Sequence, residues 1–366
     1  MTATAMSRDT PVLDAAGLTQ FNALRPAAID AVTARFFSVH GSLYERFGQR
    51  GRDACREDLG YHLEFLRPVL EFGMVQPMVD YLRWLSGVLA TRDVPLQHLP
   101  QSLDWLGEFF AASQEAPSGP AVATALSEVK ARFLEAGKPS EAFPAKMPER
   151  WPECDAFEAA LLGGHRRAAA ALFEQSLARG HSLVDTEMHL VQPALYGIGL
   201  KWQNNEVSVA QEHLSTAIAQ SLMTQGLLKA ELPPPNGRRV LLACVEGNTH
   251  ALGLQMVSDA FQLGGWDVQF LGASVPTGAV TQQVNRFQPH LLGLSVSFAH
   301  QLRTVKEVIA RLAQSQGAMR PAIIIGGLAI NQFDRLAGQL GADAWSPDAR
   351  SAVASAATLA LPVDLR

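Results

Sequence analysis

The feature that most constrains the fold is a regular alternation of strand-like and helix-like segments in the last third of the chain. Apolar runs of strand length occur five times, and each is followed by a segment with helical spacing. The strand-like runs are RRVLLACV (238–245), WDVQFLG (266–272), LLGLSVS (291–297), AIIIGG (322–327) and DAWS (343–346). This order predicts a five-stranded parallel sheet with helices on both faces, joined by right-handed crossovers. We therefore expect a doubly wound α/β domain over 238–366.

Proline-rich stretches separate this domain from two helical segments. Prolines are dense from 113 to 154 and again in PPPNG at 233–237, and proline at this density cannot continue a helix. The segments 18–136 and 150–231 both have helical spacing and no strand-like alternation. We expect the first to be an all-α domain of five or six helices, and the second to be a small four-helix bundle.

Composition and charge exclude several classes of function. Charged residues make up 18% of the 366 residues and the formal net charge is -5, so whole-molecule charge gives no support for nucleic-acid binding. No apolar run approaches the 18 residues of a membrane span, and the N-terminus lacks the apolar core of a signal peptide. Cys55, Cys154 and Cys244 are far apart and form neither a metal pattern nor a disulfide framework, which favours the cytoplasm.

A histidine follows the first strand-like run of the α/β domain. Because ligands of such domains bind beyond the carboxyl ends of the strands, the loop EGNTHALG is a candidate site. His250 lies two residues after Asn248 and three before Gly253. Imidazole is a common metal ligand, the amide can accept a hydrogen bond from the other ring nitrogen, and glycine permits close approach. An ordinary loop histidine is the alternative interpretation of this motif taken alone.

Two further strand ends carry small residues that extend the motif. One run ends with Ser295 and Ser297, and another ends with Gly326 and Gly327. Together with N-x-H-x-x-G at 248–253, they resemble the pattern D-x-H-x-x-G, S-x-L and G-G of the cobalamin-binding α/β domain. That resemblance implies a flavodoxin-like (Rossmann-type) fold and covers all of the segment from 238 to the C-terminus.

The resemblance assigns a role to each of these residues. It implies that His250 is the lower axial ligand of cobalt, in place of the dimethylbenzimidazole of the cofactor. The displaced base would then lie as a nucleotide tail beside the sheet, where Ser295 would bind it and the glycine pair would leave room for it. Asn248 stands where the family usually has Asp, and Ser297 replaces Leu. Because an amide does not raise imidazole basicity as a carboxylate does, we expect weaker or more labile ligation.

The helical segment at 150–231 carries a second motif, KWQNNEVSVAQEH. A core tryptophan and a solvated Glu–His pair would explain it in isolation. Beside a cobalamin domain, Trp202 followed ten residues later by Glu212 and His213 resembles the helical cap of the CarH-type light sensors. The resemblance implies that these three residues contact the adenosyl group of adenosylcobalamin. We call residues 150–231 the cap.

Three more cap residues bear on the same site. Val207 and Met188 are candidates to line the adenosyl pocket. The CarH-type sensors have a histidine directly after the tryptophan, which binds cobalt after photolysis, but this chain has Gln203. Either the photoproduct is not bis-histidine, or another cap histidine takes that role.

The N-terminal segment shows no Arg- and Lys-rich recognition helix. A domain of packed helices with surface ion pairs is the simplest interpretation. The order of a globin-like helical segment, a CarH-like cap and a cobalamin domain, however, resembles the photocobilins, and this implies biliverdin in the N-terminal domain. A tetrapyrrole needs aromatic walls, arginines for its propionates and a polar group facing its pyrrole nitrogens. The candidates are Asp58, His62, Arg67, Tyr81, Arg83 and Trp84. We expect noncovalent binding rather than a thioether to Cys55.

The resemblances imply a light sensor rather than an enzyme. Photolysis would change the packing of the cap, and the signal would leave through a light-dependent homo-oligomer or a separate protein effector, with no direct contact to nucleic acid or membrane. Two alternatives share the α/β motif. One is a corrinoid carrier protein of a methyltransferase system, and the other is a cobalamin-binding antirepressor without a bilin.

Overall fold

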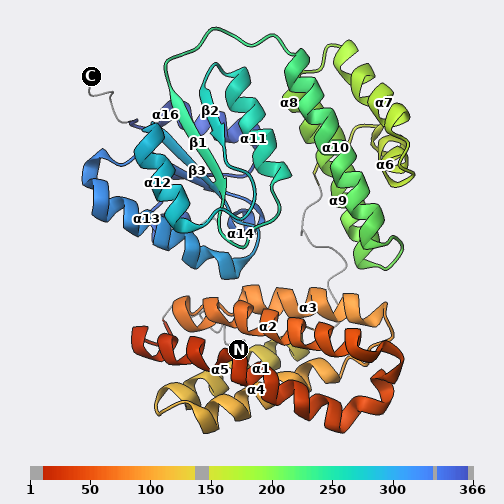
Figure 1. The fold of residues 1–366 in the computed structure, drawn as a ribbon, viewed down its shortest axis with the longest axis vertical. Helices are drawn as coiled ribbons and strands as arrows, with labels where there is room; N and C mark the ends of the chain where they lie inside the picture. The colour runs from red at the N-terminus through yellow and green to blue at the C-terminus, as the bar shows by residue number, and fades with distance from the viewer. Residues whose placement is uncertain (1–10, 137–147, 333–335, 362–366) are drawn as a thin grey trace, which may run out of the picture. The chain divides into compact units, whose positions relative to one another are not determined.

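A computed structural model describes residues 11–136, 148–332 and 336–361 (Figure 1). The chain divides into two compact units, Met1–Phe143 and Pro144–Arg366. The cap and the α/β domain therefore belong to one unit. No helix within the described residues is long and apolar enough to cross a membrane.

The first unit is all-α in its described part. Its helices are α1 (Ala15–Tyr44), α2 (Gly48–Phe72), α3 (Gln76–Ala90), α4 (His98–Ser113) and α5 (Ser118–Glu135), with a short 3-10 turn η1 (Glu45–Phe47). Asp14 caps α1 by accepting a hydrogen bond from the N–H of Gly17. Phe21 of α1 stacks on Phe110 of α4 at 4.9 Å between ring centroids, and both side chains are fully buried. The expected number of helices, five or six, agrees with the described elements.

The cap folds as a helical bundle in which α8, η2 and α9 form one continuous helix. Its elements are α6 (Cys154–Leu162), α7 (Arg166–Ala178), α8 (Leu183–Thr186), η2 (Glu187–Val191), α9 (Gln192–Gln203) and α10 (Val209–Lys229). The η2 segment is one turn of π-helix, a departure from α geometry that is frequent at functional sites. Ser208 and Gln211 form a capping box that starts α10.

The α/β domain contains the expected five-stranded parallel sheet. Its strands are β1 (Arg239–Cys244), β2 (Asp267–Phe270), β3 (Leu291–Ser295), β4 (Ala322–Gly326) and β5 (Ala344–Ser346). They pair in the order β2-β1-β3-β4-β5, which is the flavodoxin-like order. Chain connections leave β1 and β3 in opposite directions, so the ligand end of the sheet is expected between these two strands.

Helices cover both faces of the sheet (Figure 1). They are α11 (Leu252–Leu263), α12 (Thr277–Phe287), α13 (Leu302–Gln316), α14 (Leu328–Gln332), α15 (Leu336–Leu340) and α16 (Ala349–Thr358), with 3-10 turns η3 (Ala299–Gln301) and η4 (Gly317–Met319). Residues 333–335, inside the helix predicted for 331–340, lie outside the described residues. Apolar side chains of α11 and α16 share one core with β1, β3 and β4.

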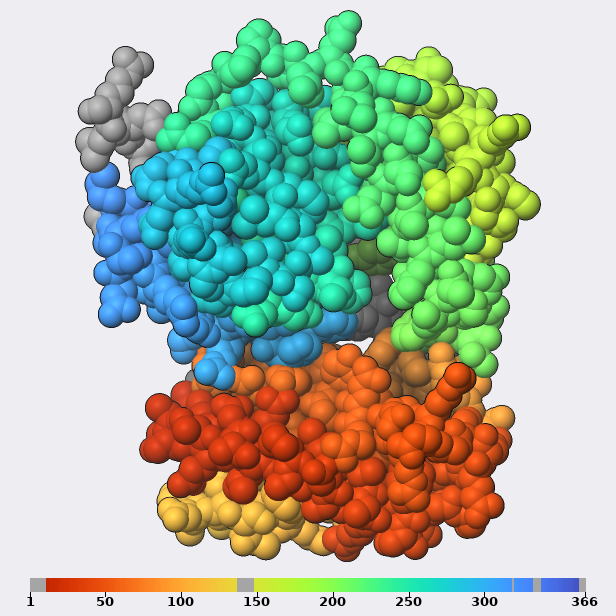
Figure 2. All heavy atoms as spheres, in the orientation of Figure 1, coloured from red at the N-terminus to blue at the C-terminus, as the bar shows by residue number. Residues whose placement is uncertain are grey.

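The cap packs on the α/β domain through α11. Met256 and Ala260 of α11 are buried in the same apolar cluster as the cap core. The side chain of Gln220 on α10 donates to Gln255 at 3.2 Å, and Arg350 of α16 pairs with Asp185 of α8. In Figure 2 the green side chains of α10 meet the teal side chains of the α/β domain, and the surface is hollowed between them below this contact.

Candidate functional site

His250 lies in the loop after β1, at the carboxyl end of the sheet beside β3. Its side chain is exposed, and its ring meets the edge of Phe298 from the loop after β3 at 5.3 Å. Partial burial lowers the pKa of His250 below its usual value, while the carboxylate of Glu212 on the cap opposes this shift. The ring is therefore neutral at pH 7, and a neutral imidazole is the form that binds a metal.

Asn248 fixes the loop that carries His250. Its side chain is fully buried, its Nδ2 donates to the main-chain oxygen of Ser295 at 2.9 Å, and its Oδ1 accepts from the main-chain N–H of His250 at 3.1 Å. The expected hydrogen bond from the imidazole ring to this amide is not made. The amide instead joins the β1 loop to the end of β3, because both of its polar atoms are used by the main chain.

Gln301 completes this connection and was missed from the sequence. Its Oε1 accepts from the main-chain N–H groups of Ser297 and Phe298 at 3.0 and 3.1 Å, and its Nε2 donates to the oxygen of Gly247 at 3.0 Å. The side chain is 2% exposed. A glutamine four residues after the serine pair was the available signal, but nothing in the local pattern shows that it reaches back to the β1 loop.

The serines and the glycine pair lie where the sequence placed them, at the ends of β3 and β4. Ser295 and Ser297 are buried. A Cβ on Gly326 would meet the main-chain oxygen of Ser346 at 2.9 Å, and one on Gly327, whose φ is +99°, would collide with the main chain of Val296. The expected reason for these glycines was room for a nucleotide tail. The structure shows that the neighbouring main chain leaves no space for a side chain at these two positions, and the role toward a nucleotide tail stays a prediction.

Gly253 differs from that pair because its surroundings are open. It lies in the first turn of α11, two residues beyond the loop, and a Cβ built there has nothing within 4 Å. Among the described residues, no group of three or more His, Cys, Asp or Glu can hold a metal ion. One exposed histidine beside an open surface fits a metal whose other ligands arrive with it, as in a corrin.

The predicted upper-face residues lie on α9, α10 and the turn between them. Trp202 is half-buried near the end of α9. Glu212 pairs with His213 at 2.5 Å and accepts from the hydroxyl of Thr216 at 3.0 Å. Glu212 of the cap also acts on the pKa of His250 in the β1 loop, which it raises.

The remaining cap candidates are less prominent. Val207 is half-buried in the turn before α10, and Met188 of η2 packs on the apolar core of the cap. Gln203, which replaces the histidine of the CarH-type pattern, is 6% exposed. Its burial places the amide inside the cap rather than at an open face.

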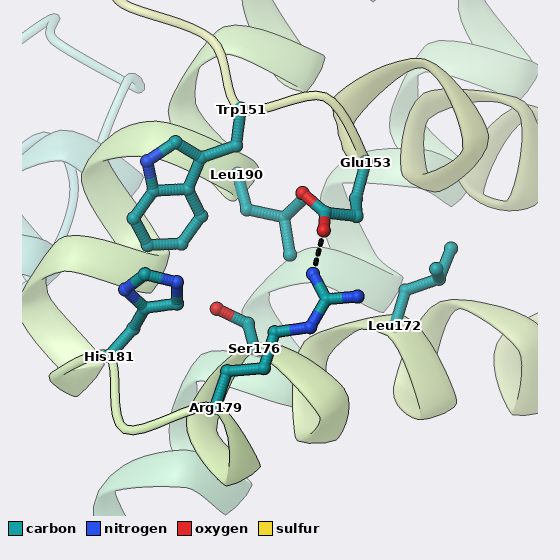
Figure 3. Close-up of a pocket in the computed structure, with 7 residues that line it drawn as sticks. All are labelled: Trp151, Glu153, Leu172, Ser176, Arg179, His181 and Leu190. Carbon is teal, nitrogen blue, oxygen red and sulfur yellow. Dashed lines mark ion pairs between the residues drawn. The ribbon is translucent and has the colours of Figure 1, made fainter.

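A small cavity inside the cap is shown in Figure 3. Its lining residues are Trp151, Glu153, Leu172, Ser176, Arg179, His181 and Leu190. Arg179 pairs with Glu153, and the rings of Trp151 and His181 are 4.2 Å apart. With a volume of about 10 Å³, it holds about one water molecule and cannot take a tetrapyrrole.

Four of the six predicted bilin residues lie together between α2 and α3. Tyr81 hydrogen bonds to Nδ1 of His62 at 2.9 Å, and its ring lies 6.3 Å from that of Trp84. Burial lowers the pKa of His62 to about 4 and raises the pKa of Asp58 to about 6. Phe65 was missed, yet it stacks on Tyr81 at 4.0 Å.

The two predicted arginines are placed differently. Arg67 pairs with Glu64 at 3.4 Å, and Glu64 also pairs with Arg25. Arg83 is half-buried on α3. Burial raises the pKa of Cys55 to about 12, so its thiol stays protonated and is a poor nucleophile.

The α/β segment and the cap both match known family models. Residues 238–355 match a model described as B12 binding domain, and residues 153–225 match a second model of the same description. The chain carries a cobalamin-binding domain. The cobalamin-binding character and the Rossmann-like fold expected from the sequence are thereby confirmed, whereas a globin-like N-terminal fold stays a prediction.

Individual relatives share this part of the chain. The HTH-type transcriptional repressor CarA of Myxococcus xanthus is 31% identical over 137 residues, which is 37% of this chain and 46% of that protein. Dimethylamine corrinoid protein 3 of Methanosarcina acetivorans is 29% identical over 149 residues, 39% of this chain and 69% of that protein. The chain thus spans about half of the length of the repressor. The solved structure of a Methanosarcina barkeri monomethylamine corrinoid protein is 20% identical and covers 56% of this chain and 96% of that one, with a TM-score of 0.48.

The descriptions of these matches share one feature, the binding of a corrinoid or the regulation of transcription. They name cofactor-binding domains, a transcriptional repressor and corrinoid proteins. This agrees with the expectation that the chain binds cobalamin.

Proposed function

We propose that this protein is a light sensor that binds adenosylcobalamin between the β1 and β3 loops and the cap. The observation that carries the proposal is the exposed His250 in the loop after β1, at the carboxyl end of the sheet and within a segment that matches a B12 binding domain. Similarity to the repressor CarA supports a regulatory role.

The described residues fit the cofactor in three respects. His250 offers an unprotonated nitrogen for the lower face of cobalt, and the surface beside Gly253 is open. Trp202 offers an aromatic surface for the adenosyl group, and Glu212 with His213 offers hydrogen-bonding groups beside it. Adenosylcobalamin supplies a cobalt–carbon bond that visible light breaks.

The cap residues then carry the signal. Trp202 would hold the adenosyl group by packing against it, and without that packing the contact between α10 and α11 would be free to change. We propose that this change alters self-association or the binding of a separate protein effector in the cytoplasm, without direct contact to nucleic acid.

We also propose that the first unit binds biliverdin between α2 and α3. Tyr81, Trp84 and Phe65 supply aromatic surface, and Asp58 and His62 supply polar groups for the pyrrole nitrogens. Arg83 and Arg67 are the candidates for the propionates, with Arg67 exchanging its present partner Glu64. The protonated thiol of Cys55 supports noncovalent binding.

The light response is tested on the full chain loaded with adenosylcobalamin. We expect both the absorption spectrum and the elution volume on a sizing column to change after green light. The same chain loaded with hydroxocobalamin is the control and should not respond. Identical dark and lit elution profiles would remove the photosensor proposal.

The bilin is tested by adding biliverdin to the chain without cofactors. We expect a red absorption band that elutes with the protein and that weakens in His62→Leu. Tyr61→Phe is the matched control, because Tyr61 is exposed and, among the described residues, its hydroxyl donates to the nearby Glu57. If no band comigrates with the protein, a cobalamin-binding antirepressor without a bilin is the better interpretation.

A corrinoid carrier of a methyltransferase system is the second candidate function. It is favoured by the similarity to dimethylamine corrinoid protein 3, 69% of which is covered by this chain. A carrier needs the lower-face residues but not the combination of Trp202, Glu212 and His213. Equal affinity for methylcobalamin and adenosylcobalamin, with no light response, would favour the carrier.

A further inference from the structure

Two buried carboxyl groups face each other where the cap meets the α/β domain. Glu187 begins η2 in the cap and is 0% exposed, and Asp259 lies on α11 and is 2% exposed. The two carboxyls are close enough that each acts on the pKa of the other. The pair therefore lies on the contact that must change if the cap moves.

Three of the four carboxyl oxygens of this pair are buried without a hydrogen-bond donor from the described residues. Among the described residues, neither oxygen of Glu187 nor Oδ2 of Asp259 has a hydrogen-bond donor. Met256 and Ala260, which flank Asp259 on α11, belong to the apolar core shared with the cap. Two ionised carboxylates in such surroundings would repel each other without compensation.

Most charged groups on neighbouring elements have other partners, but the buried Nδ1 of His189, on η2 itself, has no hydrogen-bond partner among the described residues. Arg350 of α16 pairs with Asp185, and Lys229 of α10 pairs with Glu174 of α7. The other ion pairs of the cap among the described residues are Arg150–Glu158, Lys201–Glu158, Arg150–Asp155, Arg179–Glu153 and His213–Glu212. His189 of η2 packs its ring 5.3 Å from Trp151. The group acting on Glu187 across the contact is therefore Asp259 itself.

We propose that Glu187 and Asp259 share one proton, and that this proton holds the cap against α11 until separation of the two elements releases it. A shared proton puts one O–H···O hydrogen bond between the two carboxyls and leaves a single negative charge on the pair. The inference rests on the proposed function only in taking loss of adenosyl as the trigger for separation.

The closed and open states of the cap differ in how many protons the carboxyl pair binds. Burial and the neighbouring carboxylate raise the pKa of Glu187 to about 10 in the closed state, and burial also raises the pKa of Asp259. In the open state both groups meet water and return to ordinary values of about 4. Between these limits the closed state holds one more proton, so each unit of pH rise favours opening by up to about tenfold.

Hydrogen exchange on the full chain without cofactor tests this directly. The opening equilibrium of α8–η2 and α11 amides, corrected for intrinsic exchange, is followed from pH 6 to pH 9. We expect it to rise with pH in the wild type and to stay flat in Glu187→Gln, whose neutral amide donates to Asp259 at every pH. Asp259→Asn is the second variant and should also be flat. Glu174→Gln, an exposed cap carboxyl, is the matched control and should keep the wild-type slope.

Three results would overturn the shared proton. They are a wild type with no pH dependence, a wild-type slope retained in both variants, and a stoichiometric cation found between the two helices by native mass spectrometry. The light trigger is tested separately with a pH-indicator dye on the adenosylcobalamin-loaded chain. We expect about one proton released per chain after green light, and none from Glu187→Gln. If hydrogen exchange shows the expected pH dependence but light releases no proton, the shared proton between Glu187 and Asp259 is supported. Light as the trigger of its release is then contradicted.

Discussion

The two sides of the candidate cobalamin site are built in different ways. On the α/β side, Asn248 and Gln301 are buried, and their side chains bond the β1 loop to the β3 loop through main-chain groups. On the cap side, His213 is exposed and Glu212 bonds to neighbours on its own helix. The difference indicates that the loops on the α/β side are held by the sheet, whereas Glu212 and His213 on the cap side are held by neighbours on their own helix. Under the proposed function, the lower face would be preorganised and the upper face would take its final arrangement from the cofactor.

This contrast has a functional consequence. A preorganised lower face keeps the metal ligand in place whatever happens above it, because its loops are fixed by the sheet. An upper face with few fixed contacts can rearrange at low cost when its ligand leaves. The variants described next test whether the two sides of the site differ in this way.

The largest effect is expected from Gly327→Ala on the lower side. A Cβ at a φ of +99° collides with the main chain of Val296, and we expect a loss of about 3 kcal/mol or more in the free energy of unfolding. Urea denaturation of the second unit measures it. Gly278→Ala is the matched control, because a Cβ there meets nothing within 4 Å. Equal stability of the two variants would contradict a rigid lower face.

The next effect is expected from Gln301→Leu. The substitution leaves the N–H groups of Ser297 and Phe298 and the oxygen of Gly247 without their partner, at a cost of roughly 2 kcal/mol in stability. We expect a further fall in cobalamin affinity, because the loops are no longer held together. Gln316→Leu, at the far end of α13, should change neither quantity. Stability lost with unchanged affinity would show that the loop connection does not position the site.

Trp202→Ala tests the upper side. Because Trp202 is assigned only to the adenosyl group, we expect affinity for adenosylcobalamin to fall by about tenfold, or ~1.4 kcal/mol. Affinity for hydroxocobalamin should stay the same, as measured by titration calorimetry. A parallel loss for both cofactors would mean that the cap contacts the corrin generally and does not select adenosyl.

The smallest effect concerns pH. The pKa of His250 lies below its usual value of about 6.5. Just below pH 6.5 the folded protein therefore binds fewer protons than the unfolded chain. Acidification through that range weakens both folding and cobalt binding. We expect half of the cobalt ligation by His250 to be lost at a pH below 6.5. The visible spectrum of the bound cobalamin measures this loss. Glu212→Gln removes the opposing carboxylate and should move this midpoint slightly lower. A midpoint that moves to higher pH would contradict the effect of Glu212 on the pKa of His250.

The sheet could be predicted from the sequence, but its supporting contacts could not. Five strand-like runs separated by helices lead to a parallel sheet, and N-x-H-x-x-G placed His250 at its ligand end. The hydrogen bonds of Gln301 depend on which loops the sheet order brings together, and no local pattern carries that information. Glu187 and Asp259 look like solvated charges on helices, and their burial follows only from the packing of the cap on α11.

Nitrogen labelling with electron paramagnetic resonance tests the central claim most directly. The full chain, with all histidines labelled with ¹⁵N, is loaded with cob(II)alamin, and the splitting from the axial nitrogen is compared with that of the unlabelled protein. Ligation by His250 should change three-line splitting to two-line splitting on labelling, and His250→Ala should abolish that change. Three-line splitting that persists in the labelled wild type would mean that the cofactor keeps its own base, and would contradict the lower face described above.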